Sequence, residues 1–93
     1  MNPELDKRLR QVAQALRSYG ARDIYVFGSV LTAQMRENSD IDLAVVGLPA
    51  QVFFRAMGEA REILGRPVDL VDLDKSDPFT DYLRASQELQ RVG

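Results

Sequence analysis

The stretch that decides the fold is IYVFGS at residues 24–29, followed after ten further residues by DIDLAVV at residues 40–46. Both stretches are rich in branched or aromatic side chains and run into a glycine, a pattern that predicts β-strands. Because successive side chains of a strand point to opposite faces, Asp40 and Asp42 are expected on one face and Ile41 on the other. The second strand is therefore predicted to present two carboxylates on one surface.

Helices are predicted on either side of these strands. Apolar residues keep helical spacing over residues 3–19 and 50–64. A third strand is expected at residues 68–73, and a short helix at residues 30–35. A last helix is expected to begin near Pro78, where Ser76 or Asp77 can cap it. Its side chains expected to face the core are Phe79, Tyr82, Leu83 and Leu89.

This alternation of helices and strands favours an α/β (α+β) fold, in which a small mixed β-sheet has helices packed on one face and leaves the other accessible. The chain has 93 residues, so we expect a single domain over residues 1–93. The hydrophobic fraction of 45% and the charged fraction of 28% are typical of a globular protein.

The composition excludes several kinds of chemistry. The sequence contains no Cys and no His, which excludes thiolate nucleophiles, Ser-His-Asp triads and His- or Cys-based zinc sites. A bound metal would need oxygen ligands, which favours Mg²⁺, Mn²⁺ or Ca²⁺. The net charge of −2 argues against nonspecific nucleic-acid binding. No apolar run is long enough to span a membrane and the N-terminus has no signal-peptide pattern, so we expect a cytoplasmic protein.

The residues that can carry chemistry lie around the two quoted stretches. Paired carboxylates such as Asp40 and Asp42 repel each other unless a cation lies between them, and a divalent metal with oxygen ligands relieves that repulsion. Gly28 and Ser29 follow a strand, where backbone N–H groups and a hydroxyl can bind phosphate. The alternative interpretation is an ordinary strand-to-helix turn next to an Asp pair that ends a loop and faces solvent.

Asp69 is a third candidate, because a charged residue in an apolar strand should face water or a cation. If its strand lies beside the second strand, Asp69 completes a cluster of three carboxylates. Asp72 alternates to the opposite face and Asp74 falls in the following turn. Both residues are therefore better explained as solvent-exposed residues at the end of the strand than as members of the carboxylate cluster.

Taken together, Gly28-Ser29, Asp40-Ile41-Asp42-Leu43 and Val68-Asp69-Leu70-Val71 resemble the motifs of the minimal nucleotidyltransferases, small relatives of the DNA polymerase β-type nucleotidyltransferase superfamily. The resemblance implies that Gly28 and Ser29 bind a nucleoside triphosphate such as ATP. It also implies that Asp40, Asp42 and Asp69 bind Mg²⁺ at a two-metal site, and that Asp69 activates the attacking hydroxyl. Many relatives act as antitoxins of HEPN-type toxins, some by transferring AMP to the toxin. A HEPN-type partner is therefore implied as well.

One segment departs from the family pattern. Relatives usually follow Gly-Ser with an Arg-x-Arg-Gly segment, whereas residues 30–33 are VLTA here. Arginine pairs well with phosphate, so nucleotide affinity is expected to be lower unless Arg36 substitutes. Two rival hypotheses follow: an antitoxin that neutralises its partner by binding alone, and a metal-binding structural subunit that takes no nucleotide.

Phe54 is a candidate interface residue. It lies beside Phe53 but off the apolar stripe of the helix predicted at residues 50–64. Exposed aromatic residues near an arginine are enriched at interfaces, so Phe54 is predicted to support a homo-oligomer or partner contact. The alternative is that the ring lies flat on the surface.

Overall fold

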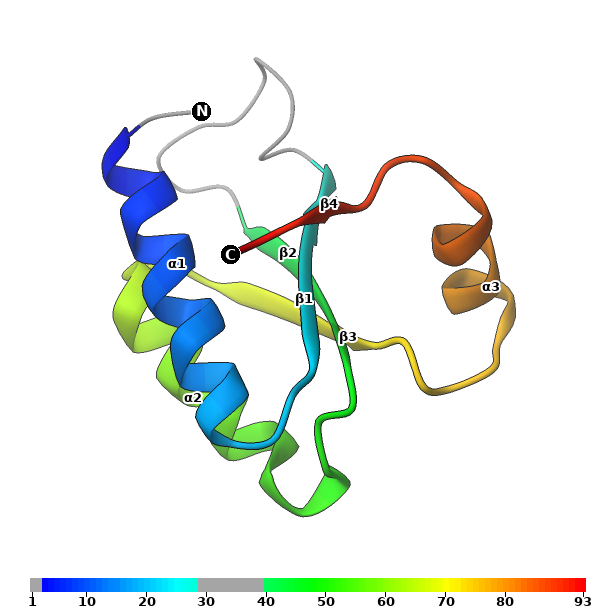
Figure 1. Cartoon of the computed structure of the whole chain (residues 1–93), viewed down its shortest axis with the longest axis horizontal. Helices are drawn as coiled ribbons and strands as arrows, with labels where there is room; N and C mark the ends of the chain where they lie inside the picture. The colour runs from blue at the N-terminus through cyan, green and yellow to red at the C-terminus, as the bar shows by residue number, and fades with distance from the viewer. Residues whose placement is uncertain (1–2, 29–39) are drawn as a thin grey trace.

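A computed structural model describes residues 3–28 and 40–93. A four-stranded sheet in the order β3-β2-β1-β4 forms its centre, with helices on both sides (Figure 1). The strands are β1 (Asp23–Phe27), β2 (Ile41–Val46), β3 (Val68–Asp72) and β4 (Gln90–Arg91). The predicted α/β class and the small mixed sheet are confirmed.

Strand β2 sits inside the sheet and makes one pairing of each kind. It runs antiparallel to β1, with Phe27 opposite Asp42, and parallel to β3, with Asp42 opposite Asp69. A parallel pair needs a crossover connection, which here consists of a 3₁₀ turn (Ala50–Val52) and helix α2 (Phe53–Leu64). Residues 42–45 of β2 thus have a register partner on both sides.

Helices α1 (Pro3–Ser18) and α2 cover one face of the sheet. Acidic residues in the first turn of α1 and Arg17 in its last turn suit the helix dipole. Helix α2 ends at Gly65, whose φ of 67° is the left-handed conformation that glycine adopts most easily. The main core lies between these helices and the sheet and includes Leu9, Val12, Leu16, Ile24, Val26, Leu43, Ala56 and Ala60. In the part of the chain described, no helix is long and apolar enough to cross a membrane.

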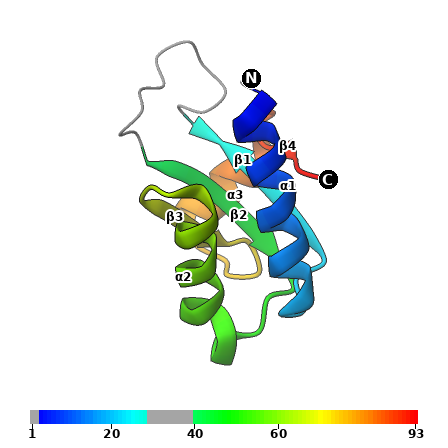
Figure 2. The same cartoon turned by 90° about the vertical axis from the view of Figure 1, so that its left-hand side faces the viewer.

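Helix α3 (Pro78–Ala85) lies on the other side of the sheet, as the two views together show (Figures 1 and 2). It opens with a capping box in which the Asp77 carboxylate accepts from the Thr80 N–H at 2.8 Å and the Thr80 hydroxyl accepts from the Asp77 N–H at 3.1 Å. Leu83 packs with Phe27, Ala44 and Leu73 in a second apolar cluster. The face expected to be open is therefore partly covered.

Two expectations for the C-terminal part were wrong. Phe79 and Tyr82 do not face the core: they are 53% and 50% exposed, because a helix of only two turns makes its contact mainly through Leu83 and Thr80. Leu89 does pack against the second cluster, but it lies beyond the helix, which ends at Ala85. Strand β4 was not predicted, since two polar residues carry no strand pattern. The short helix expected at residues 30–35 lies outside the described residues.

Candidate active site

Asp42 and Asp69 form the centre of the candidate site. They are register partners on the parallel strands β2 and β3. Their neighbours Ile41, Leu43, Val68 and Leu70 belong to the core under α1 and α2, so both aspartates point to the face that carries α3. Asp42 is half-buried and Asp69 is exposed. The alternation of the two strands thus brings two of the three predicted carboxylates onto one surface.

Asp40, the third predicted carboxylate, lies just before β2 and is exposed. It is close enough to act on Asp42 electrostatically. Burial raises the pKa of Asp42 above its usual range, and the negative charges of Asp69 and Asp40 raise it further. Ionised Asp42 is therefore destabilised by its own surroundings, a condition that a neighbouring cation would relieve.

Gly28 lies directly against Asp42. It follows the last residue of β1, has a φ of 75°, and a Cβ added to it would overlap the Asp42 carboxylate oxygen Oδ2. Glycine is needed here both for the left-handed backbone and for the close approach. The end of β1 is thus brought into contact with the carboxylate. Ser29, the other predicted nucleotide-binding residue, lies outside the described residues.

Asp72 and Asp74 have the structural role predicted for them. The Asp74 carboxylate accepts a hydrogen bond from the Gly47 N–H at 2.8 Å, and the Asp72 carboxylate accepts one from the Asp74 N–H at 2.9 Å. These bonds tie the turn after β3 to the end of β2. Both residues lie at the strand end opposite the one near Asp69, so they take no part in the carboxylate group.

The residues present fit a divalent cation in their chemistry. Asp40, Asp42 and Asp69 offer carboxylate oxygens, the ligands that Mg²⁺ takes in proteins, and the pKa of Asp42 is raised by burial first and then by the charges of Asp69 and Asp40. Within residues 3–28 and 40–93, however, no three acidic side chains are arranged closely enough to hold one metal ion. The convergence of all three on a metal stays a prediction.

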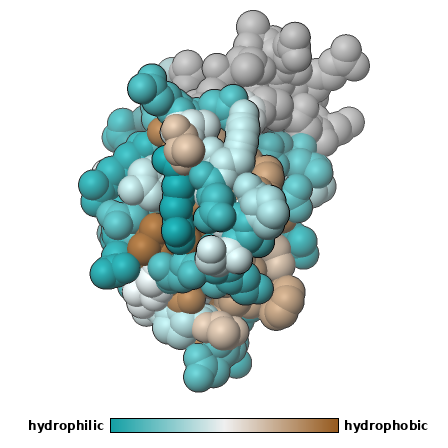
Figure 3. All heavy atoms as spheres, turned by 90° about the vertical axis from the view of Figure 1, so that its right-hand side faces the viewer, coloured by the Kyte–Doolittle hydropathy of each residue, from teal (hydrophilic) through white to brown (hydrophobic). Residues whose placement is uncertain are grey.

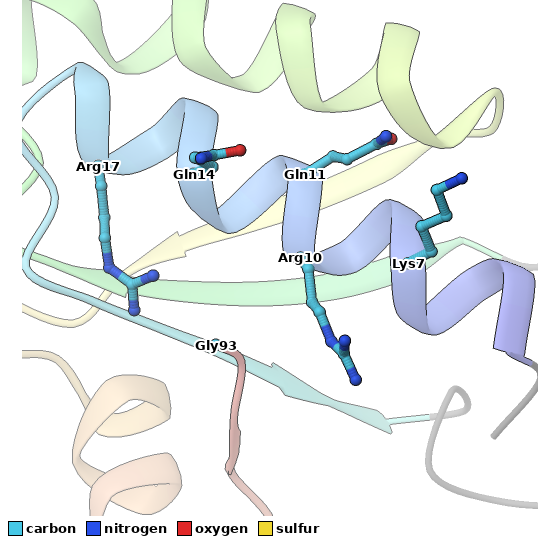
Figure 4. A pocket seen from close by; sticks show the side chains of 6 residues that line it. All are labelled: Lys7, Arg10, Gln11, Gln14, Arg17 and Gly93. Carbon is cyan, nitrogen blue, oxygen red and sulfur yellow. The ribbon is translucent and has the colours of Figure 1, made fainter.

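A separate pocket of about 390 Å³ lies on the outer side of α1 (Figure 4). Its lining consists of Lys7, Arg10, Gln11, Gln14, Arg17 and Gly93. Arg10 is paired with Asp6 at 2.6 Å, and Arg17 donates to the Val92 carbonyl at 3.3 Å. Because α1 covers the face opposite Asp42, this basic pocket does not supply positive charge to the carboxylates.

The side of the molecule that carries α3 is largely hydrophilic, with separate hydrophobic patches (Figure 3). Phe27 shares this face with Asp42, its register partner, and its ring lies 6.3 Å from that of Phe79 at an interplanar angle of 57°. The sequence pattern does not indicate that Phe79 lies near the carboxylates. The only signal was the apolar spacing of α3, which is equally typical of a core position.

The sequence was compared with known families and curated proteins. The family described as polymerase beta, nucleotidyltransferase, matches residues 10–89, which include Gly28 and all three candidate aspartates. No curated protein is a significant match. The match covers most of the chain and agrees with the motif spacing.

Solved structures with the same fold include a toxin-antitoxin complex with AMP-PNP, at 24% identity and a TM-score of 0.75 over 91% of this chain and 72% of that chain. A protein described as a minimal nucleotidyltransferase is 29% identical, with a TM-score of 0.73 over 90% and 88% of the two chains. A complex of an MNT antitoxin with a tri-AMPylated HEPN toxin from Shewanella oneidensis is 22% identical, with a TM-score of 0.67 over 94% and 70%. The predicted resemblance is confirmed: this chain belongs to the polymerase β family of nucleotidyltransferases.

Proposed function

We propose that this nucleotidyltransferase moves a nucleoside monophosphate, AMP from ATP, onto a hydroxyl group of a partner protein. The observation that carries the proposal is the register of Asp42 opposite Asp69, with the Gly28 backbone against the Asp42 carboxylate. The two carboxylates can bind a divalent cation, and the glycine backbone beside them can bind the triphosphate. The likeness to a complex with AMP-PNP supports ATP as the nucleotide.

Asp40, Asp42 and Asp69 are the residues that would hold Mg²⁺, at a site for two ions. When bound, Mg²⁺ supplies Lewis-acid stabilisation of charge on the phosphate oxygens. The raised pKa of Asp42 supports this assignment, because a cation there offsets the repulsion from Asp69 and Asp40. Without a bound cation, the negative charges of the carboxylates would repel the negatively charged triphosphate.

In the proposed reaction, a hydroxyl oxygen of the partner forms a bond to the α-phosphorus of ATP. The bond from that phosphorus to the oxygen bridging to the β-phosphate breaks, and pyrophosphate leaves. Asp69 is exposed and can accept the hydroxyl proton. Gly28, together with Ser29, would approach the phosphates closely because no side chain intervenes at the glycine. No covalent enzyme intermediate is required.

The partner proposed is a HEPN-type toxin, and this chain is its antitoxin. The likeness to complexes of an MNT antitoxin with a HEPN toxin, one of them AMPylated, supports this choice. In the proposed complex the acceptor hydroxyl belongs to the partner, so docking of the partner would position that hydroxyl.

The test is transfer of label from α-labelled ATP in the presence of Mg²⁺ and a partner that co-purifies with the tagged chain. The expected result is one labelled partner protein and release of pyrophosphate. Asp42→Asn should abolish labelling, and Asp81→Asn, which removes an exposed carboxylate of α3, should leave it intact. A wild-type chain that binds its partner and yet transfers no label would contradict the proposed reaction.

The second candidate function is an antitoxin that neutralises its partner by binding alone. The observation in its favour is residues 30–33, VLTA, where relatives carry a basic segment that pairs with phosphate. The same experiment separates the two functions. Neutralisation that persists in Asp42→Asn, without labelling by the wild type, favours the binding function.

A further inference from the structure

An aromatic pair adjoins the carboxylates on the face that carries α3. Phe27, Asp42 and Asp69 are successive register partners across β1, β2 and β3, so their side chains form one row on that face. Phe79 of α3 lies over the Phe27 end of this row, with the two ring centres 6.3 Å apart. The row thus begins with two aromatic rings and ends with two carboxylates.

The two rings differ in their access to solvent. Phe27 is 8% exposed and belongs to the second apolar cluster, so packing explains its position. Phe79 is 53% exposed, and its ring packs against that of Phe27 at an interplanar angle of 57°, so part of the side chain is packed and the rest stays accessible. An exposed ring that packs against a buried ring offers an apolar surface to a ligand.

The other exposed aromatic residues lack this setting. Tyr82, one turn further along α3, donates its hydroxyl to the Glu88 carboxylate at 3.3 Å. Phe54 belongs to α2 and lies near Asp72 and Lys75, at the end of β3 away from Asp69. Among the exposed large hydrophobic residues of the described chain, Phe79 is the one whose ring pairs with a ring of the row containing Asp42.

A nucleotide whose phosphates face Gly28 and Asp42 must place its base to one side of them. Aromatic side chains bind bases by stacking, which requires only a free ring face and tolerates every base. We propose that Phe79, supported by Phe27, is the stacking surface for the nucleobase of the bound triphosphate. This inference rests on the proposed function, and it assigns Phe79 to base binding with little discrimination among the four bases.

The chain contains no Trp, which allows a direct binding experiment. Phe79→Trp places the chain's single tryptophan, which can be excited apart from the three tyrosines, on the stacking surface, and Phe54→Trp is the matched control at an exposed aromatic position elsewhere. With Mg²⁺ present, ATP, GTP and CTP should each quench the fluorescence of Phe79→Trp. They should leave Phe54→Trp unchanged, and inorganic tripolyphosphate should quench neither variant.

Calorimetry gives the size of the effect. Phe79→Ala should weaken ATP binding about 5- to 150-fold, the range measured when an aromatic residue that stacks on a base is removed. Binding of tripolyphosphate should not change, because the phosphates do not contact the ring. Should Phe79→Ala fail to fold, Phe79→Leu keeps an apolar side chain over Phe27 while removing the aromatic face, and the same loss is expected.

The results separate this inference from the proposed function. If the wild type binds ATP and both Phe79→Ala and Phe79→Leu bind it with the same affinity, the role of Phe79 is overturned. The proposed nucleotide site is not affected by that result. Equal weakening of ATP and tripolyphosphate would also overturn it, since that result assigns Phe79 to the phosphates or to the fold. A wild-type chain that binds neither compound would overturn both the proposed nucleotide site and the inference.

Discussion

Asp42 and Asp69 lie opposite each other on two parallel strands, and both point away from the main core. Two carboxylates in this position repel, and this repulsion adds to the effect of burial in raising the pKa of Asp42. The alternation of polar and apolar side chains along these strands requires only a polar residue at positions 42 and 69, and a neutral one would serve as well as an aspartate. The pairing therefore lowers the stability of the ionised chain, and a bound cation would offset that loss.

Asp42→Asn should abolish nucleotidyl transfer and leave the fold intact. The substitution removes a ligand charge at nearly constant shape. Loss of a residue that merely supports a ligand costs about 10- to 100-fold, so loss of a ligand itself should exceed about 100-fold in rate. Labelled transfer at saturating Mg²⁺, with circular dichroism of the variant, checks this outcome. Retained transfer would rule out a metal role for Asp42.

The pH dependence of stability should reveal the cost of ionising Asp42, which comes from its burial and from repulsion by Asp69 and Asp40. A carboxyl whose folded pKa is raised above its ordinary value of 3.8 opposes folding once it ionises. In the metal-free chain this cost is absent below about pH 3.8, grows as the pH rises through the folded pKa, and is complete above it. Asp42→Asn should therefore be more stable than the wild type near pH 7, and the difference should vanish in acid. Urea unfolding at several pH values with a chelator present measures it, and a difference that grows in acid would contradict the sign.

The alternation of side chains along the strands predicts which face carries Asp42 and Asp69. It does not predict how the two strands pair or where Phe79 lies. The apolar residues flanking Asp42 and Asp69 fix the face of each strand, because a shift by one residue would bury the charges. The pairing of these two residues depends on the crossover through α2, which local patterns do not encode. Phe79 was misplaced because the spacing of a two-turn helix does not say which side meets the sheet.

Gly28→Ala should impair both folding and function. The new Cβ would overlap the Asp42 carboxylate, and the φ of 75° costs an alanine about 1–2 kcal/mol. Gly58→Ala is the matched control, since a Cβ there meets nothing within 4 Å and the residue lies inside α2. That change should stabilise the protein by about 0.5–1 kcal/mol. Thermal unfolding compares the two variants, and equal effects would show that contact with Asp42 does not matter.

Asp77→Ala should loosen α3 and lower the melting temperature. The Asp77 carboxylate accepts from the Thr80 N–H, and this bond holds the pKa of Asp77 below its ordinary value of 3.8. Its contribution to stability is fully present above that value and is lost as the pH falls through the lowered pKa. Asp77→Asn, which keeps a capping side chain without the charge, should lose less. Melting curves at pH 7 and pH 2 test both statements, and an Asp77→Ala effect that is larger in acid would contradict them.

Phe54→Ser should weaken self-association or partner binding while leaving nucleotide binding unchanged. Phe54 is 78% exposed and stands edge-on to Phe53 beside a small pocket of about 140 Å³ that Asp72 and Lys75 help to line. An aromatic anchor at a protein interface contributes about 2 kcal/mol or more, so the dissociation constant should rise at least tenfold. Sedimentation and calorimetry measure this, with Gln51→Ser as an exposed neighbouring control. Unchanged association of the folded variant would remove Phe54 from any interface.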